Sequence, residues 1–129
     1  MTIQFFKLDW PLPDIIVPVP LSFSHRLSRG YNQSFLIAKE MGHLLQRSAK
    51  ELLKRRQYDF PQAELGKKER TNLSPESFKW RTREQVSDQI VLLIDDVMTT
   101  RTTLNHCASR LQEGFPKYIY AMTFCASNP

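Results

Sequence analysis

The stretch VLLIDDVMTTRTTL, residues 91–104, decides the fold. Its first four residues belong to a run of five consecutive apolar residues, 90–94. Such a run is typical of a strand that is covered on both faces of a parallel sheet. A polar loop, 95–102, follows, and residues 103–113 carry apolar side chains at helical spacing, with Gly114 placed as the C-terminal cap. A second apolar run, 118–124, completes a predicted strand–loop–helix–strand unit.

The N-terminal half predicts a second unit of the same kind. Residues 15–19 form a short β-branched run that Pro18 and Pro20 end, and residues 34–45 carry a helical apolar stripe. The remaining segments are predicted as a loop at 21–32, a short strand at 51–54, and irregular chain at 58–77 with one helical turn near 65–73. We therefore predict one α/β domain over residues 1–129, with a mostly parallel sheet flanked by helices.

Several classes of protein do not fit this sequence. No run of 18 apolar residues exists for a membrane span, and the N-terminus lacks the pattern of a secretory signal. The two cysteines, Cys107 and Cys125, have neither CxxC spacing nor a histidine at ligand spacing, so no zinc site is expected. We expect a cytoplasmic protein without a membrane partner.

The formal charge of +5 is concentrated in the middle of the chain. Residues 47–83 hold eleven Lys/Arg and five Asp/Glu, a local net charge of +6, whereas the remainder has −1. Such a segment suits an anionic partner, and we expect it to contact a nucleic acid or another protein. A solvated basic face is the alternative explanation.

Asp95 and Asp96 follow the apolar run 90–94 directly, where ligands bind in parallel α/β sheets. Two carboxylates there can accept hydrogen bonds from paired ribose hydroxyls and hold a divalent cation through water. The next residues, 98–103, lead into a helix whose first amides favour a phosphate. The same pattern also arises when acids cap a loop and threonines cap a helix, so both explanations stay open on the residues alone.

The stretch 91–104 resembles the signature for 5-phosphoribosyl-1-pyrophosphate (PRPP) of type I phosphoribosyltransferases: an apolar strand, two acids and a Thr-Gly-x-Thr loop. Residues 15–126 as a whole resemble the ComF family of competence-associated, phosphoribosyltransferase-like proteins. The motifs that carry the ComF likeness are, in order, Val17-Pro18-Val19-Pro20, His25-Arg26, Arg29-Gly30-Tyr31-Asn32-Gln33, Leu53 with Arg55, Pro61-Gln62, and Arg70, Asn72 and Phe78.

The resemblance implies a PRPP-binding protein that transfers a phosphoribosyl group with release of pyrophosphate, assisted by Mg²⁺. Asp95 and Asp96 would bind the ribose and hold the metal indirectly. The other implied roles are the 5-phosphate loop at Thr99, Thr100, Arg101, Thr102 and Thr103, the pyrophosphate loop at Val19, Pro20, Arg26 and Arg29, and a flexible loop at Gly30, Tyr31, Asn32 and Gln33. The resemblance identifies no catalytic residue or acceptor.

Two features depart from the resemblance. Arg101 stands where the signature has glycine, which would let the backbone approach the phosphate closely. The N-terminal zinc segment and lead-in strand of longer relatives have no match here. Two functions therefore remain: a transferase, or a non-catalytic module that binds a ribose phosphate or a DNA-processing partner through its basic middle segment. A homodimer that completes the sheet or the site is compatible with either.

Overall fold

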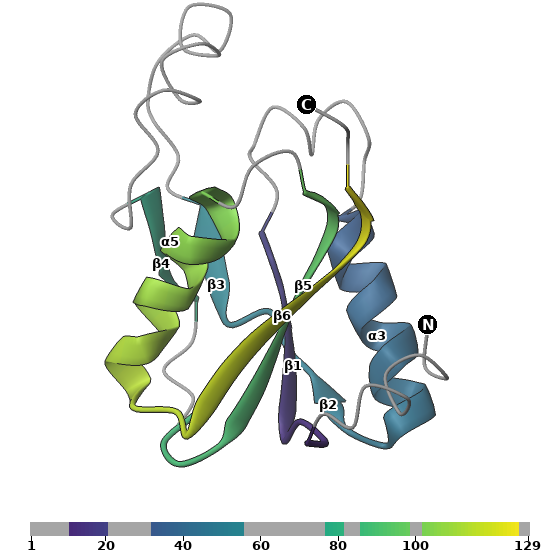
Figure 1. The fold of residues 1–129 in the computed structure, drawn as a ribbon, viewed down its shortest axis with the longest axis horizontal. Helices are drawn as coiled ribbons and strands as arrows, with labels where there is room; N and C mark the ends of the chain where they lie inside the picture. The colour runs from purple at the N-terminus through teal and green to yellow at the C-terminus, as the bar shows by residue number, and fades with distance from the viewer. Residues whose placement is uncertain (1–10, 21–31, 56–76, 82–85, 99–101, 127–129) are drawn as a thin grey trace, which may run out of the picture.

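The computed structural model describes residues 11–20, 32–55, 77–81, 86–98 and 102–126 (Figure 1). Its elements are, in order, β1 (Ile15–Pro18), α3 (Gln33–Leu45), β2 (Ser48–Ala49), β3 (Leu53–Arg55), β4 (Phe78–Trp80), β5 (Ile90–Met98), α5 (Thr102–Leu111), a 3₁₀ turn (Gln112–Gly114) and β6 (Tyr118–Ala126). No helix among these residues is long and apolar enough to cross a membrane.

A four-stranded sheet in the order β2-β1-β5-β6 forms the centre of the molecule, and every pairing in it is parallel. The register sets Ile15 beside Val91 and Ile90 beside Tyr118, so all four strands point the same way. The predicted parallel sheet with flanking helices is therefore confirmed.

Alternate residues of the buried strands enter two separate cores, because side chains along a strand point to opposite faces. Ile16, Leu92 and Ile94 pack with α3 on one face. Val17, Val91 and Leu93 pack on the other face with α5 and the β3–β4 pair. Figure 1 shows this three-layer order, with the sheet between α3 and α5. An uninterrupted apolar run was needed in β5 because both of its faces are covered.

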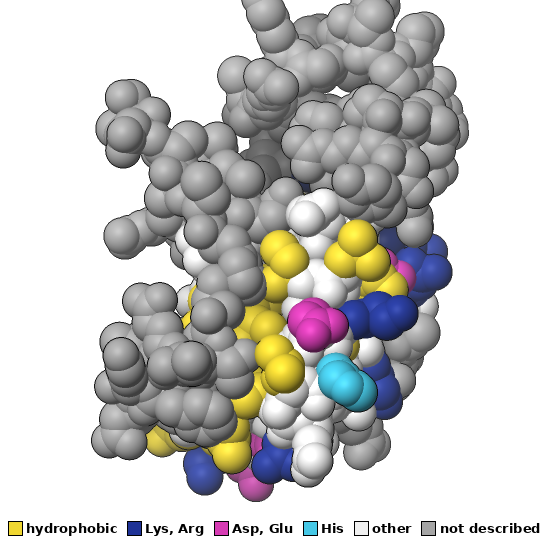
Figure 2. All heavy atoms as spheres, turned by 90° about the vertical axis from the view of Figure 1, so that its right-hand side faces the viewer, with side chains coloured by type: hydrophobic (Ala, Val, Ile, Leu, Met, Phe, Trp, Pro, Cys, Tyr) yellow, Lys and Arg dark blue, Asp and Glu magenta, His cyan; other side chains and the backbone are white. Residues whose placement is uncertain are grey.

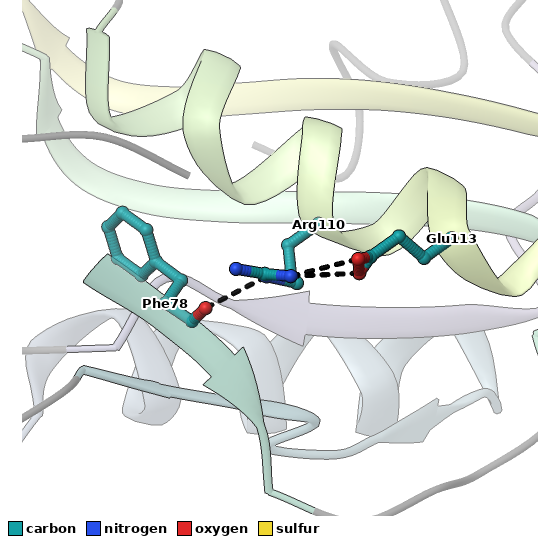
Figure 3. Close-up of polar contacts among 3 residues, drawn as sticks. All are labelled: Phe78, Arg110 and Glu113. Carbon is teal, nitrogen blue, oxygen red and sulfur yellow. Dashed lines mark hydrogen bonds and ion pairs between the residues drawn. The ribbon is translucent and has the colours of Figure 1, made fainter. Parts of the chain in front are cut away.

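The short antiparallel pair β3–β4 is joined to α5 by Arg110. Its Nε donates to the carbonyl oxygen of Phe78 at 2.8 Å, and its Nη1 donates to both carboxylate oxygens of Glu113 at 2.8 and 3.0 Å (Figure 3). Phe78 is fully buried. One half-buried guanidinium thus holds β4 against the helix.

The outer face of α3 is mixed in character. Leu36 and Leu44 are 47% and 55% exposed. Figure 2 shows hydrophobic side chains along one flank of this face, beside acidic, basic and histidine side chains.

The structure corrects several predicted boundaries. β5 continues to Met98, so Asp95 and Asp96 lie within the strand and not in a loop after it. The strand predicted at 51–54 is Leu53–Arg55, and β2 and β4 were not predicted. Helix α5 passes into a 3₁₀ turn, and the left-handed residue after it is Phe115 (φ 58°) rather than Gly114. The helical turn predicted near 65–73 lies outside the described residues.

Candidate functional site

The candidate site lies at the carboxyl edge of the sheet. β1 and β5 run toward this edge, and both α3 and α5 begin there (Figure 1). Because the amides of a helix's first turn have no partner within the helix, each helix directs partial positive charge to this edge. The topology therefore brings carboxylates, hydroxyls and the positive ends of two helix dipoles to one region.

Asp95 lies in this region beside a residue 61 positions earlier in the chain. Ser34, in the first turn of α3, donates from its Oγ to Asp95 Oδ1 at 3.4 Å. Ser34 is buried at 2% exposure, while Asp95 is half-buried and pairs with Thr123 of β6 in the strand register. The carboxylate therefore lies beside the first turn of α3 and is partly exposed to solvent. Ser34 was not predicted as a site residue; the available signal was its position two residues after Asn32, a residue type that often caps helices.

Asn32 joins the end of β1 to the start of α3. Its Oδ1 accepts from Ser34 N–H at 3.0 Å, which caps the helix, and its Nδ2 donates to the Val19 carbonyl oxygen at 3.2 Å. Asn32 is 8% exposed. The expectation that Asn32 and Gln33 belong to a flexible loop is therefore wrong: Asn32 is a buried helix cap, and Gln33 begins the helix.

The structure describes only part of the predicted phosphate site. Thr102 and Thr103 form the first turn of α5; Thr102 is exposed and Thr103 half-buried. Val19 is buried and Pro20 half-buried at the end of β1. Thr99, Thr100, Arg101, Arg26, Arg29, Gly30, Tyr31 and the side chain of Asp96 lie outside the described residues. Within the described part of the chain, no three His, Cys, Asp or Glu side chains gather as a metal site.

The buried thiol of Cys107 is influenced by one charge from the carboxyl edge of the sheet, Asp95, and by one from β3, Arg55. Burial raises the pKa of the Cys107 thiol, the negative charge of Asp95 raises it further, and the positive charge of Arg55 opposes them. Arg55 is the last residue of β3, and its guanidinium carbon lies 5.1 Å from the centre of the Phe78 ring. The charges of Asp95 and Arg55 therefore both influence the pKa of the buried thiol on α5. Arg55 lies in a motif shared with the ComF family, but no role was predicted for it.

No protein-family model matches the chain. Among curated proteins, Competence protein F of Haemophilus influenzae is 31% identical over 104 residues, which cover 79% of this chain and 45% of that protein. The chain thus spans less than half the length of this relative.

Solved structures with the same fold are phosphoribosyltransferases. A purine phosphoribosyltransferase from Pyrococcus horikoshii superposes with a TM-score of 0.59 at 16% identity, covering 97% of this chain and 65% of that one. A hypoxanthine-guanine phosphoribosyltransferase from Bacillus anthracis gives 0.56 at 14% identity, covering 97% and 64%. At these identities the likeness concerns the fold. The chain therefore has the fold of these phosphoribosyltransferases and is similar to Competence protein F over 104 residues.

Proposed function

We propose that the chain binds PRPP, or a closely related ribose phosphate, at the carboxyl edge of its sheet. The observation that carries this proposal is the half-buried carboxylate of Asp95, which lies 3.4 Å from the Ser34 hydroxyl at the start of α3. A half-buried carboxylate is a strong acceptor for paired hydroxyls, because hydrogen bonds to ionised groups are shorter and stronger than neutral ones. A ribose offers such a pair of hydroxyls.

The phosphate would lie at the start of α5. Thr102 and Thr103 bring hydroxyl groups to the first turn of that helix, where the helix dipole favours an anion. The fold of the solved neighbours, whose names describe phosphoribosyltransferases, supports the same assignment. Asn32 holds the carbonyl of Val19 and so fixes the end of β1, where we place the pyrophosphate.

The reaction suited to this arrangement is loss of pyrophosphate from C1 of the ribose and attack by an acceptor. The oxygen donors Asp95 and Ser34 suit Mg²⁺ bound indirectly, through water or the ligand's own oxygens. Bound Mg²⁺ would neutralise charge on the leaving pyrophosphate. The protein's part is to orient the ribose through Asp95 and the phosphate through α5. Positioning and electrostatic stabilisation of the leaving group would lower the activation barrier for loss of pyrophosphate.

Calorimetric titration of the full chain with PRPP and Mg²⁺ tests the binding. We expect saturable binding that the Asp95→Asn substitution weakens on the order of tenfold to a hundredfold, because hydrogen bonds to a charged acceptor are lost. Asp88→Asn is the matched control. It removes the same charge at the opposite end of β5, and Asn tolerates the left-handed backbone of Asp88 (φ 60°). Equal PRPP affinity in Asp95→Asn and wild type would contradict the proposal.

Pyrophosphate release, measured with each nucleobase in turn, tests turnover. Release that depends on both Mg²⁺ and one base would identify a transferase and its acceptor. Binding without release under any condition would favour the alternative, a non-catalytic module that senses a ribose phosphate.

A further inference from the structure

Strand β6 forms one edge of the parallel sheet. It runs over nine residues, Tyr118–Ala126, and among the described residues no strand lies on the side of β6 that faces away from β5. Figure 1 shows β6 in front of the other strands, with α5 and α3 to either side. The opposite edge of the sheet is β2, which has two residues. The sheet therefore has one long edge and one very short edge.

The pairing of β5 shows which backbone groups of β6 face outward. Val19 N–H donates to the Ile94 carbonyl oxygen at 2.8 Å, so the N–H and C=O groups of Ile94 face β1. Those of the next residue in either direction, such as Leu93, therefore face β6. In a parallel pair, such a residue bonds to the two residues that flank its register partner, and the partner itself faces away. The outward residues are the register partners of Val91, Leu93 and Asp95, namely Ile119, Ala121 and Thr123.

The long edge lacks the features that protect exposed strands in natural sheets. Such strands usually carry charged residues or proline, or contain a bulge that turns the edge away, because another strand can otherwise add to them. Residues 118–126 contain no charged residue, proline or glycine. The register with β5 keeps one offset from Ile90 beside Tyr118 to Met98 beside Ala126, so the strand has no bulge. The outer edge of β6 is therefore suited to receive another strand.

We propose that this edge pairs with β6 of a second copy of the chain, antiparallel about a twofold axis at Ala121. In this register Ala121 lies opposite Ala121 of the second copy, and Ile119 lies opposite Thr123. All the residues in these pairs face outward, so the two strands exchange about six backbone hydrogen bonds. The result is one continuous sheet of eight strands from two sheets of four.

The sequence of β6 suits pairing with itself. Because residues 118–126 are uncharged, no like charges meet near the axis. Ala121 is small and exposed, so two copies of it fit opposite one another. Ile119 and Thr123 are both β-branched, and such side chains pack well across strands. The two-residue strand β2 is too short to receive β6, so pairing closes at two copies and does not continue as a filament.

The pairing surface adjoins the candidate site without being part of it. Thr123 is the register partner of Asp95, so the second copy would lie two strand spacings, about 10 Å, from β5 at that level. The inference does not depend on the function proposed for the site, since it rests on the backbone and composition of β6.

Sedimentation velocity of the full chain between about 1 and 100 µM tests the inference, since this range spans micromolar affinity. We expect wild type to form a dimer with increasing concentration. Ala121→Lys places two ammonium groups opposite one another, so the dissociation constant of the dimer should rise on the order of tenfold or more. Ala121→Glu should have the same effect. An equal mixture of the two variants should restore the dimer, because opposite charges then meet at the axis.

Two controls accompany these variants. Ala121→Ser keeps a small neutral side chain, and Asn105→Lys adds the same charge at an exposed position of α5, so both should dimerise as wild type does. Circular dichroism and the Tm verify that Ala121→Lys folds, which is expected because residue 121 is exposed. The dimer should also slow hydrogen exchange at the outward amides of Ile119, Ala121 and Thr123.

Any of three results would overturn the inference. The first is a wild-type chain that stays monomeric at the highest concentration. The second is a dimer that survives both charged variants, or that their mixture does not restore. The third is a dimer in which the amides of Ile119, Ala121 and Thr123 exchange as fast as in the monomer, because the two copies would then meet elsewhere.

Discussion

The side-chain amide of Asn32 donates to the carbonyl oxygen of Val19 at 3.2 Å, across 13 positions of the chain. The same side chain caps α3 through its oxygen. One buried residue therefore joins the end of β1 to the helix that positions Ser34 beside Asp95. The geometry of the candidate site depends on this link.

Replacing Asn32 tests the link. Asn32→Ala removes both the cap and the donor, and we expect a loss of about 2 kcal/mol in the free energy of unfolding. Asn32→Asp keeps the capping oxygen but replaces the donor to Val19 with a carboxylate oxygen that faces the Val19 carbonyl, so the expected loss is at least about 1 kcal/mol. Urea unfolding followed by circular dichroism measures both. An Asn32→Asp variant as stable as wild type would show that the bond to Val19 contributes nothing.

Arg110 and Arg81 allow a direct comparison of a half-buried and an exposed guanidinium. Arg110 binds the Phe78 carbonyl and Glu113 and has 22% of its side chain exposed, whereas Arg81 binds Glu51 and has 47% exposed. We expect Arg110→Gln to cost about 2 kcal/mol, because a charged hydrogen bond to a buried strand is lost. Arg81→Gln should cost less than about 1 kcal/mol. Equal costs in chemical unfolding would contradict the role given to Arg110.

The elements that could be predicted well from the sequence are those whose burial in the core requires a regular pattern of apolar residues. The run 90–94 and the stripe 34–45 are apolar because β5 and α3 face continuous cores, so their type could be inferred directly. The strands β2 and β4 have two and three residues, too few to show an alternation of apolar and polar side chains. They are defined by their pairing with β1 and β3. Phe115 adopts a left-handed conformation without being glycine, so the composition rule placed the cap one residue early.

The candidate site likewise has residues that could be predicted from the sequence and contacts that could not. Asp95 was predicted as a site residue because ligands of parallel sheets lie at strand ends. The structure places it within β5, which continues to Met98. The contact between Ser34 and Asp95 could not be predicted, since it joins residues 61 positions apart and depends on how α3 packs against β5. Asn32 was placed in a loop because asparagine favours loops and helix caps alike.

Gly42 should resist a change that normally stabilises helices. In an open helix, Gly→Ala gains about 1 kcal/mol. A Cβ at Gly42, however, would lie 2.7 Å from the Arg47 carbonyl oxygen and 3.3 Å from Ala49 Cβ, so the chain after α3 would have to move. That carbonyl is backbone, and Arg47 N–H also donates to the Gly42 carbonyl at 2.8 Å. We therefore expect Gly42→Ala to lower the Tm. A change on the exposed side of α3, Glu40→Ala, should leave the Tm nearly unchanged, and a raised Tm for Gly42→Ala would contradict the close approach.

The buried thiol of Cys107 should make stability fall at alkaline pH. Its pKa is raised above the ordinary value of 9.0 by burial and by Asp95, so the folded chain keeps a proton that the unfolded chain releases. The resulting stabilisation is complete below pH 9 and is lost as the pH rises above it, with a slope approaching about 1.4 kcal/mol per pH unit. Tyr120, whose pKa is raised by burial and by Asp14, acts with the same sign above its ordinary value of 10.0, so measurements between pH 8 and 10 isolate the thiol.

The measurement is the free energy of unfolding in urea across that range, in a Cys125→Ser background so that Cys107 is the remaining thiol. Adding Cys107→Ala should remove most of the decline between pH 9 and 10, whatever its effect on absolute stability. Iodoacetamide should label Cys107 slowly in the folded chain at pH 8.5 and rapidly in urea, because the thiolate is the reactive form. Rapid labelling of the folded chain, or an unchanged pH slope after Cys107→Ala, would show that this thiol is not buried beside Asp95.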